Sequence, residues 1–178
     1  MKIKFFAVGG TIDKVYFDAL STYQVGPPGI ESIIRDARVN FDYEVVSLVK
    51  KDSLDMTPQD RELILDAVQK EESRHIVITH GTDTMVETAM VLKRIKGKVI
   101  VLTGAMEPAC FKSSDAAFNL GSAVASVQTL PNGVYLAISG RVFDPAGVKK
   151  DRNRKQFVDV SSTEDNITNM AALPPQSK

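Results

Sequence analysis

The chain has 178 residues, enough for one domain with a sizeable core but short for two, and its 43% hydrophobic and 25% charged residues are ordinary for a globular protein. Lys and Arg together number 22, as do Asp and Glu, so the zero formal net charge provides no field that would favour nucleic acid or a membrane surface. No apolar run is long enough to span a bilayer, the first residues lack a signal-peptide core, and the single cysteine, Cys110, excludes an internal disulfide. We therefore expect a cytoplasmic protein.

The first predicted strand covers residues 3–8 and ends in a Gly-Gly-Thr turn at residues 9–11. Two consecutive glycines allow another backbone to approach closely, and Thr11 then falls where the strand meets a loop. Taken alone, such a triplet is more often a plain glycine turn with a capping hydroxyl. The Gly-x-Gly-x-x-Gly fingerprint is missing, which argues against dinucleotide binding.

Residues 14–29 form an irregular stretch in which Tyr16, Phe17 and Tyr23 are mixed with glycines and prolines. A loop of this length inside one domain is usually functional or disordered, and aromatic residues between glycine hinges favour a lid over a site. An exposed, mobile connection explains the composition equally well. A short helix is predicted over residues 30–35.

A second strand is predicted over residues 43–49, followed by a loop that carries Ser53 and Asp55. A cap at Thr57 with a proline directly after it predicts a helix over residues 58–72. Ser and Asp are common in turns and caps, so their position after a strand also fits a purely structural role.

The most informative stretch is residues 76–84, where a buried β-branched strand runs directly into a tight turn. Gly81 allows the sharp turn, and the Thr-Asp-Thr that follows is typical of a helix cap, which predicts a helix over residues 85–95. Thr82 and Asp83 thus lie side by side at the carboxyl end of a strand. In open α/β sheets this is where ligands bind.

Two further strands, over residues 98–102 and 134–138, enclose a helix that begins after residues 113–115. The alternation of strands and helices predicts an α/β fold, with a doubly wound, mostly parallel sheet flanked by helices, Rossmann-like or flavodoxin-like, in a single domain. We expect that domain to cover residues 1–160, and the polar segment 161–178 to form a flexible tail.

Hydroxyl and carboxylate side chains follow several predicted strands, and the carboxyl ends of parallel strands meet at one edge; the residues concerned are Thr11, Ser53, Thr82 and Asp83. No His or Cys cluster has ligand spacing and no lysine follows a glycine loop, so we expect neither a metal nor a cofactor. The remaining groups suit acyl transfer on a small amide, with N–H groups of the glycine-rich turns facing the oxyanion.

His80 and the basic run 149–155 carry less specific signals. A histidine beside a buried strand is more often a hydrogen-bonded structural residue. A basic run is usually solvated surface, and the zero net charge argues against a nucleic-acid patch. A lysine near a threonine–aspartate pair can nevertheless activate a hydroxyl, provided that it is neutral when it acts as the base.

Three motifs together resemble the bacterial-type L-asparaginases: Gly9-Gly10-Thr11-Ile12, Thr79-His80-Gly81-Thr82-Asp83-Thr84 and Gly104-Ala105-Met106-x-Pro108. Further matches are Tyr23 with Val25-Gly26, Ser53-x-Asp55-Met56 and Phe118-Asn119-Leu120. The first two motifs look like the paired threonine signatures of that family, and the similarity covers residues 3–155, corresponding to the family's amino-terminal catalytic domain. It implies hydrolysis of L-asparagine to L-aspartate and ammonia, with L-glutamine as a further candidate substrate.

The resemblance implies catalytic roles for five residues. Thr11 matches the nucleophile on a mobile lid, and Tyr23 matches the lid tyrosine that helps to orient it. Thr82, Asp83 and Lys150 match a second, triad-like group in which the lysine activates the other threonine or a water.

The resemblance also implies substrate contacts. Ser53 and Asp83 match groups that hold the α-carboxylate and α-amino ends of the amino acid. Gly10, Gly81 and Ala105 match positions whose backbone lines the substrate and its reacting amide. Together these residues predict a site built by the loops that follow the strands.

The sequence departs from the family at two points. At the substrate-binding position of Leu54 many members have glutamine, so a polar contact to the substrate's amino group is missing. The family's second domain, which supplies an acidic contact from a neighbouring subunit, has no match in this sequence. Because the family builds its sites between subunits, we expect a homo-oligomer, most simply a dimer. Lys149 competes with Lys150 for the catalytic lysine position.

Two other functions stay open from the sequence. One is a broader amidase that acts on glutamine, on another ω-amide or on an amide carried by a larger partner. The other is a non-catalytic domain that binds an amino acid or a protein partner.

Overall fold

A computed structural model describes residues 1–17 and 22–160; the predicted tail, residues 161–178, lies outside them. The strands are β1 (Lys2–Gly9), β2 (Lys14–Phe17), β3 (Thr22–Val25), β4 (Asp42–Lys51), β5 (His75–Thr79), β6 (Val99–Thr103), β7 (Gly133–Ile138), β8 (Arg141–Phe143), β9 (Val148–Asp151) and β10 (Gln156–Asp159). The α-helices are α1 (Ile30–Asp36), α2 (Pro58–Lys70), α3 (Met85–Leu92) and α4 (Ala116–Thr129). Among these described elements, no helix has the length and apolar character needed to cross a membrane.

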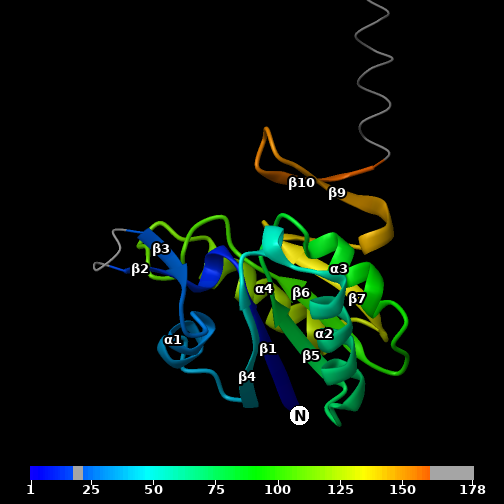
Figure 1. Ribbon diagram of the computed structural model, residues 1–178. Helices are drawn as coiled ribbons and strands as arrows, with labels where there is room; N and C mark the ends of the chain where they lie inside the picture. Colours follow the sequence, from blue (N-terminus) through cyan, green and yellow to red (C-terminus); the bar gives the residue numbers. More distant parts are fainter. Residues whose placement is uncertain (18–21, 161–178) are drawn as a thin grey trace, which may run out of the picture.

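The central sheet has the strand order β4-β1-β5-β6-β7-β8, in which all neighbours pair in parallel except β7 and β8. The parallel strands follow the flavodoxin-like order, because the chain runs from β1 outward to β4 and then returns to the other side of β1 with β5. The prediction of a doubly wound, mostly parallel sheet is confirmed (Figure 1). The order reverses between β1 and β5, which is the place where such folds bind ligands.

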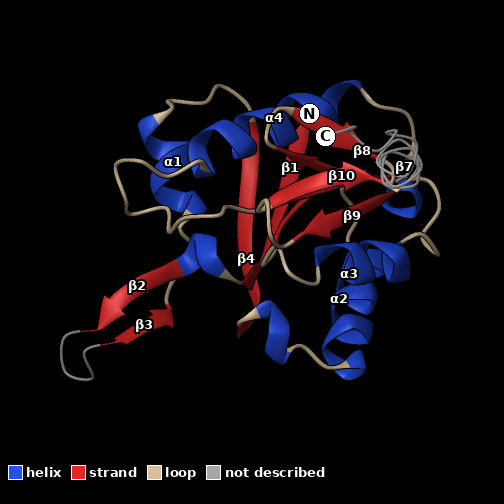
Figure 2. Ribbon diagram, turned by 90° about the horizontal axis from the view of Figure 1, so that it is seen from above, coloured by secondary structure: helices blue, strands red, loops and turns tan. Residues whose placement is uncertain are grey.

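Two apolar clusters hold the layers together, one on each face of the sheet. Helices α2 and α3 bury Ile64 and Met85 on one face, and α1 and α4 bury Ile34 and Leu120 on the other (Figure 2). β5 and β6 are buried on both faces, as their β-branched runs predict. Each large apolar side chain fully buried in this way contributes about 1.5–3 kcal/mol to stability, so the strand ends that carry the site rest on a rigid base.

Helix α2 begins as the sequence predicts, but helix α3 does not. Thr57 and Asp60 form a reciprocal capping box in front of Pro58. At α3 the expected side-chain cap is wrong: Thr84 makes no capping bond and instead donates its hydroxyl to the carbonyl of Ser53 at 2.7 Å. The bond ties the loop after β4 to the loop after β5.

Two antiparallel hairpins, neither of which the sequence predicted, flank the carboxyl end of the sheet (Figure 1). The expected loop at residues 14–29 contains the hairpin β2–β3, which projects away from the sheet, and residues 18–21 of this segment lie outside the described part. The basic run forms the hairpin β9–β10. These strands are four residues long, too short for their side-chain alternation to be recognised from sequence.

Candidate active site

The loops after β1 and β5 meet because glycine occupies both contact points. Ala7 of β1 pairs with Thr79 of β5, so the two turns begin at the same level of the sheet. Gly10 has a φ of +94°, and a Cβ there would overlap the backbone of Gly81. A Cβ on Gly81 would in turn overlap the side chain of Ser53. Glycine at these positions lets three strand-end loops pack in direct contact.

A cavity of about 270 Å³ opens beside these loops and is lined by Thr11, Thr82, Asp83, Met106, Lys150, Arg152 and Lys155. Its lining comes from the ends of β1, β5 and β6 and from the hairpin β9–β10. A larger, mostly apolar hollow of about 440 Å³ lies between α1 and α4, away from the strand ends. We place the candidate active site in the smaller cavity because hydroxyl, carboxylate and amine groups converge there.

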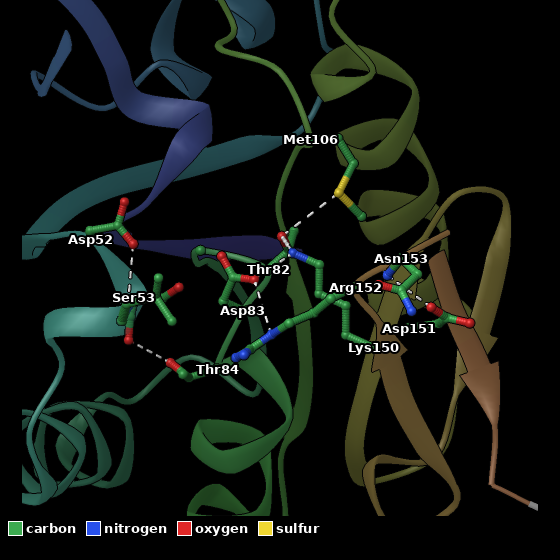
Figure 3. A network of polar contacts seen from close by, with 12 residues as sticks. Asp52, Ser53, Thr82, Asp83, Thr84, Met106, Lys150, Asp151, Arg152 and Asn153 are labelled. Carbon is green, nitrogen blue, oxygen red and sulfur yellow. Dashed lines mark hydrogen bonds and ion pairs between the residues drawn. The ribbon is translucent and has the colours of Figure 1, made fainter. Parts of the chain in front are cut away.

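Lys150 makes the closest polar contacts in the cavity. Its Nζ lies 2.7 Å from Thr82 Oγ1 and 2.8 Å from Asp83 Oδ1 (Figure 3). The Lys150 side chain is only 12% exposed, whereas Lys149 is exposed and does not line this cavity. Of the two registers that the sequence left open, the structure therefore brings Lys150 to the threonine–aspartate pair. A contact of 2.7 Å is within the range for proton transfer between a hydroxyl and an amine.

Thr11 lies at the start of the short 3₁₀ turn Thr11–Asp13 and lines the same cavity. Its side chain forms no hydrogen bond with any residue in the described part of the chain. The structure thus brings Thr11 together with the Thr82–Asp83–Lys150 group, as the sequence predicts. The two hydroxyls come from segments about 70 residues apart.

The loop after β6 is held by a buried polar network that the sequence did not reveal. Asp115 accepts from the backbone N–H of Met106 at 2.9 Å, and Asn119 donates to Asp115 and to the carbonyl of Gly104. This network fixes the buried Ala105 and places Met106 Sδ 3.7 Å from Thr82 Oγ1. Met106 therefore forms a wall of the cavity.

Ser53 and Leu54 lie beside the cavity but do not line it. Ser53 is buried behind Gly81, and its Oγ has no hydrogen-bond partner among the described residues. A buried hydroxyl without a partner costs about 1–3 kcal/mol, so such a group is unusual outside functional sites. Leu54 is 62% exposed and directs no polar group toward the cavity.

Tyr23 is not brought to Thr11 in this conformation. It lies on β3, does not line the cavity, and packs edge-on against Tyr16 and Phe111 with ring centroids 5.4 and 5.9 Å away. The base of its hairpin is tied to the site, because Gly26 N–H donates to the carbonyl of Asp13 at 2.7 Å.

His80 is a structural residue, as predicted. It is fully buried, with Nδ1 2.8 Å from the carbonyl of Gly81 and Nε2 2.8 Å from Thr88 Oγ1. A carbonyl can only accept, so Nδ1 carries the proton and Nε2 accepts from the Thr88 hydroxyl. Burial lowers the pKa of His80 to about 4, which keeps the ring neutral at physiological pH. Its bonds fix the turn that carries Thr82.

Asp13, the last residue of the turn that begins at Thr11, is buried and gives the fold a pH dependence. Its carboxylate accepts from Gly29 N–H at 2.7 Å, and burial raises its pKa to about 6 from an ordinary 3.8. Because the folded-state pKa is raised, stability from this group is fully present below about pH 4 and is lost as the pH rises through 6. The difference between the pKa of about 6 in the folded protein and the ordinary value of 3.8 corresponds to about 3 kcal/mol of folding stability.

We expect Asp13→Asn to remove this loss, because the amide stays neutral and its oxygen can still accept from Gly29. Urea unfolding at about pH 4 and pH 8 should show the variant gaining up to about 3 kcal/mol over the wild type at the higher pH only. An equal difference at both pH values would contradict the assignment.

Comparison with known proteins agrees with this geometry. The family model described as "Asparaginase, N-terminal" matches residues 2–166. The chain is 35% identical over 151 residues to the Probable L-asparaginase 4 of Schizosaccharomyces pombe, a match that covers 77% of this chain and 42% of that protein. It is 38% identical over 112 residues to the Glutaminase-asparaginase of Acinetobacter glutaminasificans, covering 60% of this chain and 33% of that protein.

Comparison with solved structures also finds an L-asparaginase. The thermostable L-asparaginase from Thermococcus kodakarensis superposes with a TM-score of 0.80 at 27% sequence identity, over 90% of this chain and 51% of that chain. The chain thus spans about half the length of that structure and less than half of the two sequence relatives. Since the family match extends over nearly all of the sequence and includes every strand-end motif of the cavity, this chain belongs to the asparaginase family.

Proposed function

We propose that the chain is an amidohydrolase that converts L-asparagine to L-aspartate and ammonia, with residues 1–160 as its catalytic domain. The observation that carries the proposal is the convergence of Thr11 with Lys150, Thr82 and Asp83 in one cavity at the switch point of the sheet. Membership of the asparaginase family supports the choice of an ω-amide as the substrate.

In the proposed reaction, Thr11 Oγ1 attacks the side-chain amide carbon of the substrate. The carbon–nitrogen bond breaks, ammonia leaves with the proton taken from the hydroxyl, and an ester to Thr11 remains. Water then attacks the ester, which releases aspartate and returns the proton to Thr11. Backbone N–H groups near Gly10 and Ala105 are the proposed donors to the oxyanion, since both glycine-rich loops border the cavity.

Lys150 is the proposed base of the second group. In its neutral form its Nζ takes a proton from Thr82 across the 2.7 Å contact, so that Thr82 or a water held by it becomes nucleophilic. Asp83 fixes the position of the amine through the 2.8 Å contact to Oδ1. The reaction needs only these side chains and water, and we propose that it uses no cofactor.

The substrate contacts follow from the neighbours of the cavity. We propose that the Ser53 hydroxyl, which is buried and has no hydrogen-bond partner among the described residues, binds the α-carboxylate, and that Asp83 binds the α-amino group. Leu54 offers only apolar contact at the edge, and Tyr23 would join the site when its hairpin closes. Among the described residues, no group of three or more His, Cys, Asp or Glu side chains could hold a metal ion.

The cellular setting and assembly are part of the same proposal. The one cysteine, Cys110, is free and exposed, which suits a reducing compartment such as the cytoplasm. The open side of the cavity and the exposed rings of Tyr16 and Tyr23 on the hairpin β2–β3 leave room for a second subunit, so we propose a homodimer. We propose no membrane or nucleic-acid partner.

The purified chain tests this proposal. Incubation with L-asparagine should release ammonia and L-aspartate in equal amounts, and L-glutamine in the same assay measures the breadth of the amidase. Binding of asparagine without any ammonia release would contradict catalysis and favour a non-catalytic amino-acid-binding domain. Competition between the two amides distinguishes an asparaginase from a general ω-amidase, because a shared site makes each amide inhibit turnover of the other.

A further inference from the structure

The base of the hairpin β2–β3 is joined to the 3₁₀ turn that begins at Thr11 through a single residue, Asp13. Its carboxyl Oδ1 accepts from Gly29 N–H at 2.7 Å, and its backbone carbonyl accepts from Gly26 N–H at 2.7 Å. Asp13 directly precedes β2, whereas Gly26 and Gly29 follow β3. These two bonds, which we call the Asp13 clamp, therefore tie both ends of the hairpin to the turn that carries the proposed nucleophile.

Close packing connects the clamp to the backbone of this turn. A Cβ on Gly29 would overlap the carbonyl oxygen of Ile12, the residue between Thr11 and Asp13. Ala109, in the loop after β6, donates its N–H to the same carbonyl at 3.1 Å. Because well-packed groups transmit displacements to their neighbours, a movement of the hairpin base also moves the Thr11 turn.

No cation compensates the Asp13 carboxyl among the described residues. Lys14, the next residue in the chain, forms its ion pair with Asp52 at 2.8 Å instead. The end of β1, the base of the hairpin and the loop after β6 surround the carboxyl with the N–H groups of Gly9 and Gly29 and with an alanine side chain. Burial raises the pKa of Asp13 to about 6, although the two N–H groups lower it. The closed site therefore holds a neutral carboxyl better than an ionised one.

We propose that Asp13 is a positioning residue that couples the hairpin β2–β3 to Thr11, so that the nucleophile is correctly placed only while the Asp13 clamp is closed; the inference rests on the proposed amidohydrolase function. Asp13 does not line the cavity, so it acts through the turn whose other end carries the Thr11 hydroxyl. The clamp opens more readily when the carboxyl is ionised, because opening returns the charged group to water.

Hydrogen–deuterium exchange followed by mass spectrometry tests the clamp without turnover, in peptides that contain Gly26 and Gly29. At pH 4 we expect Asp13→Ala to exchange these amides at least about tenfold faster than the wild type, since one hydrogen bond is lost. Asp13→Asn should match the wild type within about threefold, because its amide oxygen still accepts from Gly29. At pH 8 it should exchange up to about 100-fold more slowly than the wild type, as follows from a pKa of about 6 against 3.8. Comparison at equal pH cancels the intrinsic pH dependence of exchange.

The same variants test the effect of the clamp on turnover of L-asparagine near pH 7. Asp13→Ala should lower kcat by about 10- to 100-fold and change KM much less, because the nucleophile is displaced while the other substrate contacts remain. Asp13→Asn should keep kcat at or above about half the wild-type value. Thermal unfolding of each preparation shows that the measured protein is folded, so that a loss of kcat reports position and not the folded fraction.

Ser32→Ala is the matched control. The Ser32 hydroxyl donates to the carbonyl of Gly29 at 2.9 Å, so it contacts the same glycine without bonding to the Thr11 turn. Its removal should leave kcat within about twofold of the wild type. Wild-type kcat in folded Asp13→Ala would overturn the proposal, as would equal losses in Asp13→Ala and Ser32→Ala or in Asp13→Ala and Asp13→Asn.

Failure of the proposed function gives a different pattern. A folded wild type that releases no ammonia from L-asparagine or L-glutamine would refute the amidohydrolase assignment, and the exchange measurement then decides the clamp by itself. Faster exchange in Asp13→Ala than in Asp13→Asn supports the coupling of the hairpin to the Thr11 turn. Equal exchange of Gly26 and Gly29 in the wild type and both variants overturns it.

Discussion

Replacing Thr11 by alanine is expected to abolish turnover and to leave the fold intact. Removing a catalytic nucleophile typically costs at least about 10³-fold in kcat, because the remaining groups of the site provide only binding and oxyanion stabilisation. The Thr11 side chain makes no hydrogen bond within the described residues, so its loss removes no structural contact of that kind. The measurement is the rate of ammonia release from L-asparagine, with the thermal unfolding midpoint recorded on the same preparation.

Thr11→Ser is the informative control. Serine keeps the hydroxyl that the reaction needs and loses only a methyl group, so this variant should retain measurable activity. If Thr11→Ala still turns over L-asparagine at a rate near that of the wild type, the nucleophile is another group. Thr82 would then be the first alternative, because its hydroxyl already contacts Lys150.

Lys150→Met is expected to reduce kcat by about 10²–10⁴-fold, the range found when a general base is removed. Methionine has a similar length and no basic nitrogen, so the variant removes proton transfer from Thr82 and the anchor of Asp83 while it fills most of the same space. Asp83 is 30% exposed and keeps Arg152 nearby, so we expect only a small loss of stability.

Lys149→Met tests the same chemistry one residue away. Lys149 is exposed and does not line the cavity, so its replacement should leave kcat within about twofold of the wild type, as is usual for surface positions. A large effect of Lys149→Met together with a small effect of Lys150→Met would contradict the position given to the base.

The parallel core of the fold follows directly from the sequence. Residues 76–78 and 99–102 are uninterrupted apolar runs, and such runs are characteristic of strands covered on both faces. The hairpins β2–β3 and β9–β10 could not be predicted in the same way, because their strands are short and partly charged. Their pairing depends on tertiary contacts that a local pattern does not contain.

The part of the candidate site that lies at the carboxyl ends of the parallel strands could be predicted from the sequence. Thr11 and Thr82 each follow a buried strand, and parallel topology alone brings them to the same edge. Lys150 is separated from Asp83 by 67 positions, and only the family resemblance supplied its register. Arg152 and Lys155 were missed because, in the sequence, a basic run of this kind cannot be distinguished from solvated surface.

The most direct measurement identifies which threonine becomes acylated. Acid quenching of wild-type protein during turnover of L-asparagine, followed by tryptic digestion and mass spectrometry, separates the two candidates. Cleavage after Lys4 and Lys14 gives a peptide whose one hydroxyl side chain is Thr11, whereas Thr82 lies in the peptide spanning residues 75–93. The proposed mechanism predicts an aspartyl ester on the first peptide. An ester on the second peptide, with the first unmodified, would contradict it.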